Sequence, residues 1–205
     1  MRKFCGLLLF GFLAILALVG WAGYQSYTTG FSAKAEPHML EVLFARQLRY
    51  LAIPIENRRL RNPLPLTQDL LKEARAHFAD HCATCHANNG SGQTAIGRNV
   101  YPKAPDLRLR DTQTMSDGEL FFIIQNGIRF TGMPAFGTGD PAKDGGSWQL
   151  VHFIRHLPSL TEEELVEMKA LNPKTKKELE EEALFDLFLG GDDAAASGAA
   201  GSHQH

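Results

Sequence analysis

Cysteine is scarce in this chain, and there is almost no net charge. The 205 residues include three cysteines and carry a formal net charge of −2. The near neutrality excludes the broad basic field of nucleic-acid-binding proteins, so we expect no nucleic-acid partner. A structural zinc site needs four ligands, typically including a second pair of cysteines or histidines, and no further cysteine is available for it outside the N-terminal apolar run.

Two of the three cysteines stand in the stretch Cys82-Ala83-Thr84-Cys85-His86. The spacing C-x-x-C-H is typical of covalent attachment of a c-type haem, in which both thiols bond to the porphyrin and the imidazole binds the iron. Zinc binding and a thioredoxin-like thiol pair are the alternatives, but the latter needs a βαβ pattern and no strand-like alternation flanks the motif. We therefore predict one covalent haem c at Cys82 and Cys85, with His86 as an iron ligand.

A second iron ligand is expected in the stretch Gly132-Met133-Pro134. The glycine permits a close backbone approach, and the proline favours an extended conformation for the methionine before it. A lone methionine is otherwise a core residue. Because Met39, Met115 and Met168 are less well placed, Met133 is the predicted ligand opposite His86.

The N-terminal segment predicts a membrane anchor. Arg2 and Lys3 precede a nearly uncharged run from Phe4 to Tyr24, about 32 Å long as a helix against about 30 Å of hydrocarbon. The alternative is a signal peptide cleaved near Ala33-Lys34-Ala35, although a signal core is shorter and its cleavage site closer. We expect a retained single pass through a bacterial inner membrane, with lipid as its partner. Because Arg2 and Lys3 favour the cytoplasmic side, the haem domain would be periplasmic.

An amphipathic helix is expected between the anchor and the haem motif. Its apolar residues recur at helical spacing and stop at Pro54; they are Leu40, Leu43, Phe44, Leu48 and Leu51. This helix would pack on its own domain or dock on a partner subunit or the lipid surface. A nearby basic cluster of Arg58, Arg59 and Arg61 would suit an acidic partner.

The rest of the pattern predicts helices and no strands. Thr67 is a potential N-cap, and an apolar stripe from Leu70 through Phe78 leads into Cys82. Ser116 and Glu119 form a capping-box pattern that opens a second helix, and Thr161 and Glu164 form another one at the start of the acidic segment. A last helix from Ser147 should cross the Phe78 helix, and residues 88–115 lack periodicity, as expected for a loop around a large flat cofactor.

Two other histidine pairs are weaker candidates for metal binding. His77 and His81 lie four residues apart on the first helix of the domain, where such side chains are more often solvated. His203 and His205 end a Gly-, Ala- and Ser-rich tail that we expect to be disordered. The acidic segment before that tail would engage a partner or fold back onto the domain.

The predicted order of parts along the chain is therefore an anchor, a linker, a domain and a tail. We divide the chain into a cytoplasmic stub and anchor (1–28), an amphipathic linker (29–66), a haem domain (67–160), acidic helices (161–190) and a disordered tail (191–205).

From about Leu66 to Leu160 the chain resembles the class I c-type cytochromes, especially the mono-haem domains similar to subunit III of haem-copper oxidases. The resemblance is carried by Phe78, Cys82-Ala83-Thr84-Cys85-His86, Ala104-Pro105-Asp106-Leu107, Asn126-Gly127, Gly132-Met133-Pro134-Ala135-Phe136 and Trp148. It implies an all-α class I cytochrome c fold around one haem. It also implies that the Pro105 carbonyl accepts a hydrogen bond from His86, which would orient the imidazole.

The function expected from these features is single-electron transfer in a respiratory chain by a membrane-anchored mono-haem carrier. Respiratory redox proteins would be its partners, and it would act on no small-molecule substrate. The alternative is a fixed subunit that feeds electrons to the catalytic centre of an oxidase or another oxidoreductase. A third interpretation, a haem sensor or peroxidase with an open iron position, is disfavoured by Met133-Pro134.

Overall fold

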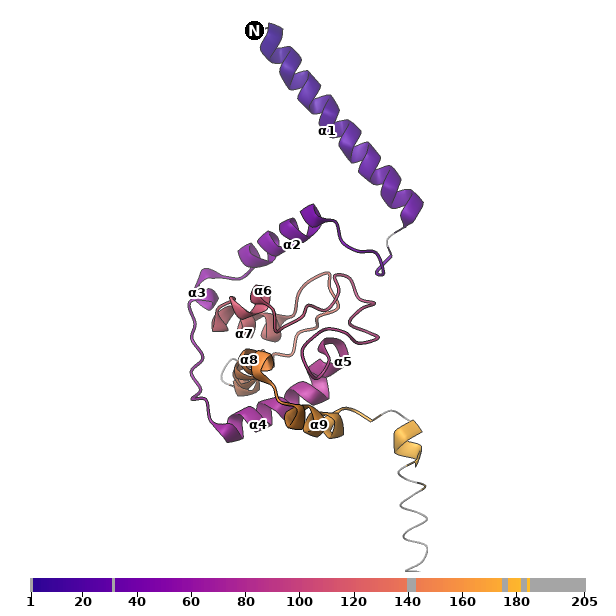
Figure 1. Ribbon diagram of the computed structural model, residues 1–205. Coiled ribbons are helices and arrows are strands. Elements are labelled where there is room, and N and C mark those ends of the chain that lie inside the picture. The colour runs from indigo at the N-terminus through magenta and orange to yellow at the C-terminus, as the bar shows by residue number, and fades with distance from the viewer. Residues whose placement is uncertain (1, 31, 140–142, 175–176, 182–183, 185–205) are drawn as a thin grey trace, which may run out of the picture.

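Helices are the regular structure of this protein, as Figure 1 shows. The computed structural model describes residues 2–30, 32–139, 143–174, 177–181 and 184, and no strand occurs among them. The elements are α1 (Arg2–Thr29), α2 (Met39–Ala52), α3 (Ile55–Arg58), α4 (Gln68–His77), the π-helical turn η1 (Phe78–Cys82), α5 (Ala83–His86), α6 (Arg110–Gln113), α7 (Asp117–Asn126), α8 (Gly145–His156), the 3-10 turn η3 (Leu157–Ser159) and α9 (Glu162–Leu171). The all-α prediction is confirmed. The predicted tail at 191–205, with His203 and His205, lies outside the described residues.

The N-terminal helix stands apart from the domain. Within α1, the segment from Leu9 to Thr28 has a mean hydropathy of 1.5 and none of it is buried. By length and composition this segment can cross a membrane. The helix extends beyond the predicted span of Phe4 to Tyr24, and in Figure 1 it projects away from the other helices.

The core lies where α4, α7 and α8 meet. The rings of Phe78 and Phe153 are 5.0 Å apart at the crossing of the first and last helices of the domain, and both side chains are fully buried. Phe121 of α7 stacks on Trp148 of α8 with ring centroids 3.9 Å apart. The predicted crossing of the Phe78 helix by the last helix is therefore confirmed.

A π-turn interrupts the helix that leads into the haem motif. The amide of Ala83 bonds to the carbonyl of Phe78, five residues back, so the helix gains one residue in that turn. Burial then passes from Phe78 and Ala79 to Ala83, whereas the stripe predicted at four-residue spacing led to Cys82. Cys82 is instead half-buried. The turn thus rotates the first cysteine partly out of the core.

Local capping signals mark three helix starts as predicted. The Thr67 hydroxyl accepts from the Leu70 amide at 3.2 Å. Ser116 and Thr161 each form a complete capping box, with Glu119 and Glu164 respectively. These caps satisfy amides that lack partners within the helix.

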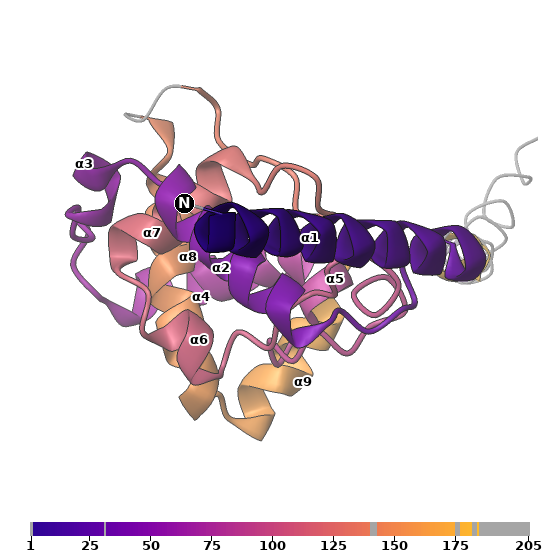
Figure 2. The same ribbon diagram turned by 90° about the horizontal axis from the view of Figure 1, so that it is seen from above.

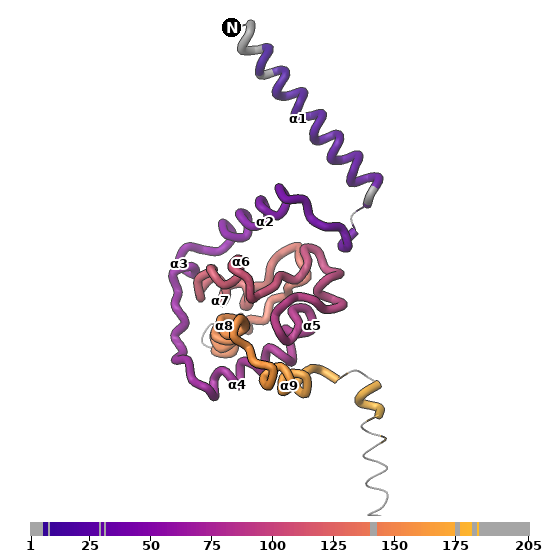
Figure 3. The backbone as a smooth tube through the Cα atoms, in the orientation of Figure 1, coloured from indigo at the N-terminus to yellow at the C-terminus, as the bar shows by residue number. Residues whose placement is uncertain are grey.

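The residues between α2 and α4 are attached to the domain along their length, and Figure 3 shows this path down one side. Ile53 is buried, with only 2% of its surface exposed. A Cβ atom at Gly118 of α7 would lie 1.8 Å from the Asn57 carbonyl oxygen of α3, so only glycine allows this approach. Further along, the side-chain amide of Asn62 donates to the Trp148 backbone carbonyl at 2.8 Å.

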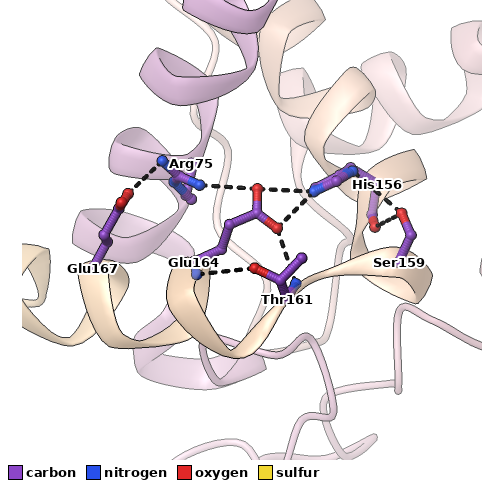
Figure 4. Close-up of polar contacts among 6 residues, drawn as sticks. All are labelled: Arg75, His156, Ser159, Thr161, Glu164 and Glu167. Atoms are coloured by element: carbon purple, nitrogen blue, oxygen red, sulfur yellow. Dashed lines mark hydrogen bonds and ion pairs between the residues drawn. The ribbon is translucent and has the colours of Figure 1, made fainter.

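The acidic segment that starts at residue 161 folds back onto the domain through α9. Met168 is fully buried, and Glu164 lies 2.9 Å from Arg75 of α4 and 3.0 Å from His156 of α8 (Figure 4). Burial alone would raise the pKa of Glu164, but hydrogen bonds from Thr161 and His156 and the Arg75 charge outweigh it and lower the pKa. The carboxylate therefore joins three elements in its ionised form.

We predict that Glu164→Gln destabilises the protein by about 1–2 kcal/mol at neutral pH, because it removes charged hydrogen bonds while keeping a side chain suited to the capping box. A folded-state pKa below the ordinary 4.5 contributes stability above that value, which is lost as the pH falls through the lowered pKa. Urea unfolding of both proteins across the acid range measures this. A stability difference that persists at low pH would contradict the ion-pair account. Exposed Glu162→Gln is the control.

Candidate functional site

The three residues of the haem motif lie on one short stretch of helix. Cys82 ends η1, while Cys85 and His86 are the last two residues of α5. Ala83 between them is buried, and Ala87, with a φ of 61°, ends the helix after its amide bonds to the Ala83 carbonyl. The motif is therefore held by the core on one side and by a helix end on the other.

Both motif cysteines are free thiols and half-buried. Burial, together with the nearby Cys85 sulfur, raises the pKa of Cys82 to about 12. Redox-active thiol pairs instead have lowered pKa values and accessible thiolates. In the described part of the chain, no group of three or more His, Cys, Asp or Glu side chains is arranged to hold a metal ion. The thioredoxin and structural-zinc alternatives therefore find no support in this geometry.

His86 has a buried ring nitrogen without a hydrogen-bond partner. Its Nδ1 atom is one of three buried side-chain N or O atoms without a partner among the described residues, and the only imidazole nitrogen of the three. Burial lowers the pKa of His86, and the nearby Pro105 carbonyl partly offsets this by raising it. A neutral imidazole is the form that binds a metal. The effect of Pro105 on this pKa places its carbonyl near the His86 ring, although Nδ1 has no hydrogen bond that meets the usual distance and angle.

The loop after the motif packs closely on its own helix. The Gly92 amide donates to the His86 carbonyl at 2.8 Å, and the Leu107 amide to the Gly90 carbonyl at 2.8 Å. A Cβ atom at Gly97 would lie 2.2 Å from the Cys85 carbonyl oxygen. These contacts return the chain past the motif and bring Pro105 beside it. Within the predicted loop of residues 88–115, the structure adds the short helix α6.

Met133 is held in a tight turn after α7. Its carbonyl accepts from the Ile128 amide at 3.1 Å, and its own amide donates to the Thr131 hydroxyl at 3.1 Å. A Cβ atom at Gly132 would lie 2.8 Å from Val100 Cγ1. The turn therefore rests on the loop that contains Pro105, and Met133 is half-buried there.

The exposed side chains around the motif show whether these residues fit a haem. They belong to two loops, residues 88–109 and 127–139. The loops expose apolar residues to solvent, whereas α7 and α8 bury most of theirs. The exposed loop residues are Ile96 49%, Leu109 59%, Phe130 95% and Phe136 38%. Two thiols, a buried imidazole and a thioether belong to the same pair of loops and the helix before them. An apolar cofactor with an iron centre matches this donor set.

The other histidines of the domain are engaged elsewhere. The ring of His152 bonds to the Leu64 carbonyl at 2.9 Å, and that of His156 to Glu164. His77 and His81 meet edge to face with centroids 5.1 Å apart, and no third ligand joins them within the described residues.

Sequence reasoning missed the contribution of Thr94. Its hydroxyl donates to the Cys85 carbonyl at 3.2 Å and accepts from the Gly97 amide at 2.8 Å, so it joins the loop to the motif. A threonine three residues before a glycine is a common turn pattern, but its contact with Cys85 depends on the folded loop.

A comparison with known families agrees with this geometry. Residues 69–154 match the family model described as cytochrome c oxidase, cbb3-type, subunit III. The matched segment begins in α4, includes the cysteine motif, Pro105 and Met133, and ends in α8. No curated protein matches the chain.

Proposed function

Because residues 69–154 match a cytochrome family model and form a class I c-type cytochrome domain, we propose that this chain binds one haem c and transfers electrons as a membrane-anchored carrier in a respiratory chain. The observation that carries the proposal is the C-x-x-C-H motif at the end of a core-anchored helix, with the Pro105 carbonyl beside the buried His86 imidazole.

Each residue of the site has a separate task in this proposal. Cys82 and Cys85 hold the porphyrin through thioether bonds, and His86 binds the iron, oriented by the Pro105 carbonyl. Met133 supplies a soft thioether ligand, which favours ferrous iron and a raised potential. The haem supplies one-electron chemistry at its iron. Cys82, Cys85, His86 and Met133 would hold this group in place.

We further propose that α1 keeps the domain at the periplasmic face of a bacterial inner membrane. The support is the exposed apolar segment Leu9 to Thr28, preceded by Arg2 and Lys3. Confinement to a membrane raises the effective concentration of the carrier near membrane-bound redox proteins. The predicted division of the chain into anchor, linker and haem domain is part of this proposal.

The second candidate is a fixed subunit that passes electrons to the catalytic centre of an oxidase. The match to subunit III of cbb3-type oxidases favours it. The carrier and the subunit share the same site and differ in the lifetime of the complex. In both, the cytochrome domain carries electrons and a partner supplies the catalysis.

We predict that haem stays attached to the denatured chain, because thioether bonds survive unfolding. In the Cys82→Ser/Cys85→Ser variant no covalent haem should remain, and Cys5→Ser should retain all of it. A haem stain of denaturing gels measures this. Haem that can be extracted from the parent protein by acid acetone would refute covalent attachment.

Met133→Ala should expose an iron position to carbon monoxide and lower the midpoint potential by on the order of 100 mV, since thioether ligation raises it. The ferrous spectrum with carbon monoxide and a redox titration measure both effects. Met39→Ala, at a side chain that is 80% exposed, is the control. Carbon monoxide binding by the parent protein would instead favour the sensor or peroxidase interpretation.

A carrier should separate from larger complexes when membranes are solubilised in mild detergent. We expect most of the haem-stained chain to migrate alone on a native gel and to be reduced and reoxidised when it is added back to depleted membranes. Stoichiometric comigration with an oxidase would identify the fixed subunit instead.

A further inference from the structure

The helix α2 has its apolar face turned away from the domain. No residue of α2 is buried, and its large apolar side chains are about two-thirds exposed: Leu40 68%, Leu43 66%, Phe44 65% and Leu51 63%. At 100° per residue these four lie on one side of the helix, whereas Val42 and Arg49 lie on the opposite side. Those two are the half-buried members of α2. An ordinary surface helix has the reverse arrangement.

Polar contacts fix this orientation. Glu41 accepts from the Tyr101 hydroxyl, and Arg46 pairs with Asp111. Ahead of the helix, Glu36 pairs with Lys103. Burial, with the nearby Arg46, lowers the pKa of Arg49, in agreement with its position against the domain. The polar side of α2 therefore lies on the 101–111 segment, which also contains Pro105.

The C-terminal end of α2 is anchored as well. Ile53, directly after the helix, is buried. Arg58 donates to the Ile53 carbonyl at 2.8 Å and places its guanidinium 4.1 Å from the centre of the Tyr50 ring. With both ends held, the helix cannot turn its apolar side inward without breaking these contacts.

The chain places this face near a bilayer. Residues 30–38 join α1 to α2, and nine residues reach at most about 30 Å. In Figures 1 and 2, α2 lies on the side of the domain nearest α1. Between residues 30 and 66, six basic residues stand against three acidic ones, a net +3: Lys34, Arg46, Arg49, Arg58, Arg59 and Arg61 against Glu36, Glu41 and Glu56. A segment with a positive net charge and an outward apolar helix face, next to a membrane span, suits an anionic lipid surface.

We propose that α2 lies in the headgroup region of the membrane that α1 spans, with Leu40, Leu43 and Phe44 among the lipid chains. This inference rests on the proposed membrane anchor. The consequence is that the cytochrome domain does not swing freely on a tether. It is held at the lipid surface with the 101–111 segment toward the membrane.

Photocrosslinking of the full, haem-loaded chain tests the proposal. The photoreactive amino acid benzoylphenylalanine replaces Leu43 in α2, Val166 in α9 or Leu16 in α1, one at a time. Leu43 and Val166 are matched in exposure, at 66% and 64%. Each protein is reconstituted into vesicles of equal parts phosphatidylglycerol and phosphatidylethanolamine, irradiated, and analysed by intact mass. Unchanged haem absorbance shows that each labelled chain is folded.

We expect lipid adducts at Leu43 to be about tenfold more abundant than at Val166, because only the former would lie at the lipid boundary. Equal yields at these two positions, with strong adducts at Leu16, would overturn the role of α2 and leave the anchor intact. Absence of lipid adducts at Leu16 would refute the anchor and with it this inference. Crosslinked dimers in vesicles, or a protein adduct at Leu43 in native membranes, would identify another occupant and also overturn the proposal.

Discussion

The contact between Phe78 and Phe153 is the constraint on which the proposed haem site depends. Its two rings meet at the crossing of the first and last helices of the domain, residues 75 positions apart in the chain. Phe78 begins the π-turn that ends at Cys82. The position of the cysteine motif is therefore set by aromatic burial four residues earlier, and the π-turn converts that anchor into partial exposure of the thiol. Loss of this contact would displace the whole motif.

The loops that surround the motif are held by contacts with the motif and with each other more than by burial in the core. They are joined by backbone bonds such as Gly92 to His86 and by close approaches such as Gly132 to Val100, and they expose apolar side chains such as Phe130. Apolar exposure of this extent has a hydration cost that a bound cofactor removes. Cofactor binding and loop order are then linked, because a group that binds the folded form stabilises it.

Features encoded in neighbouring residues could be predicted from the sequence. The caps at Thr67, Ser116 and Thr161 were correct because each depends on a hydroxyl and an amide three residues apart. The π-turn, the outward apolar face of α2 and the bond from Thr94 to Cys85 could not be predicted. Each is decided by residues distant in sequence, such as Tyr101 and Asp111 for α2.

The segment from Ile53 to Leu64, which includes α3, sets a practical limit on any soluble version of this domain. Sequence similarity to the cytochrome family begins at residue 69. Before that residue, however, Ile53 is buried, and only a glycine at position 118 of α7 leaves room for the Asn57 carbonyl. Asn62 and Leu64 bond to Trp148 and His152 of α8. A truncation made at the family boundary would remove these contacts and uncover part of α7 and α8. The folding unit is therefore larger than the homologous unit, and a truncated protein should begin ahead of Ile53.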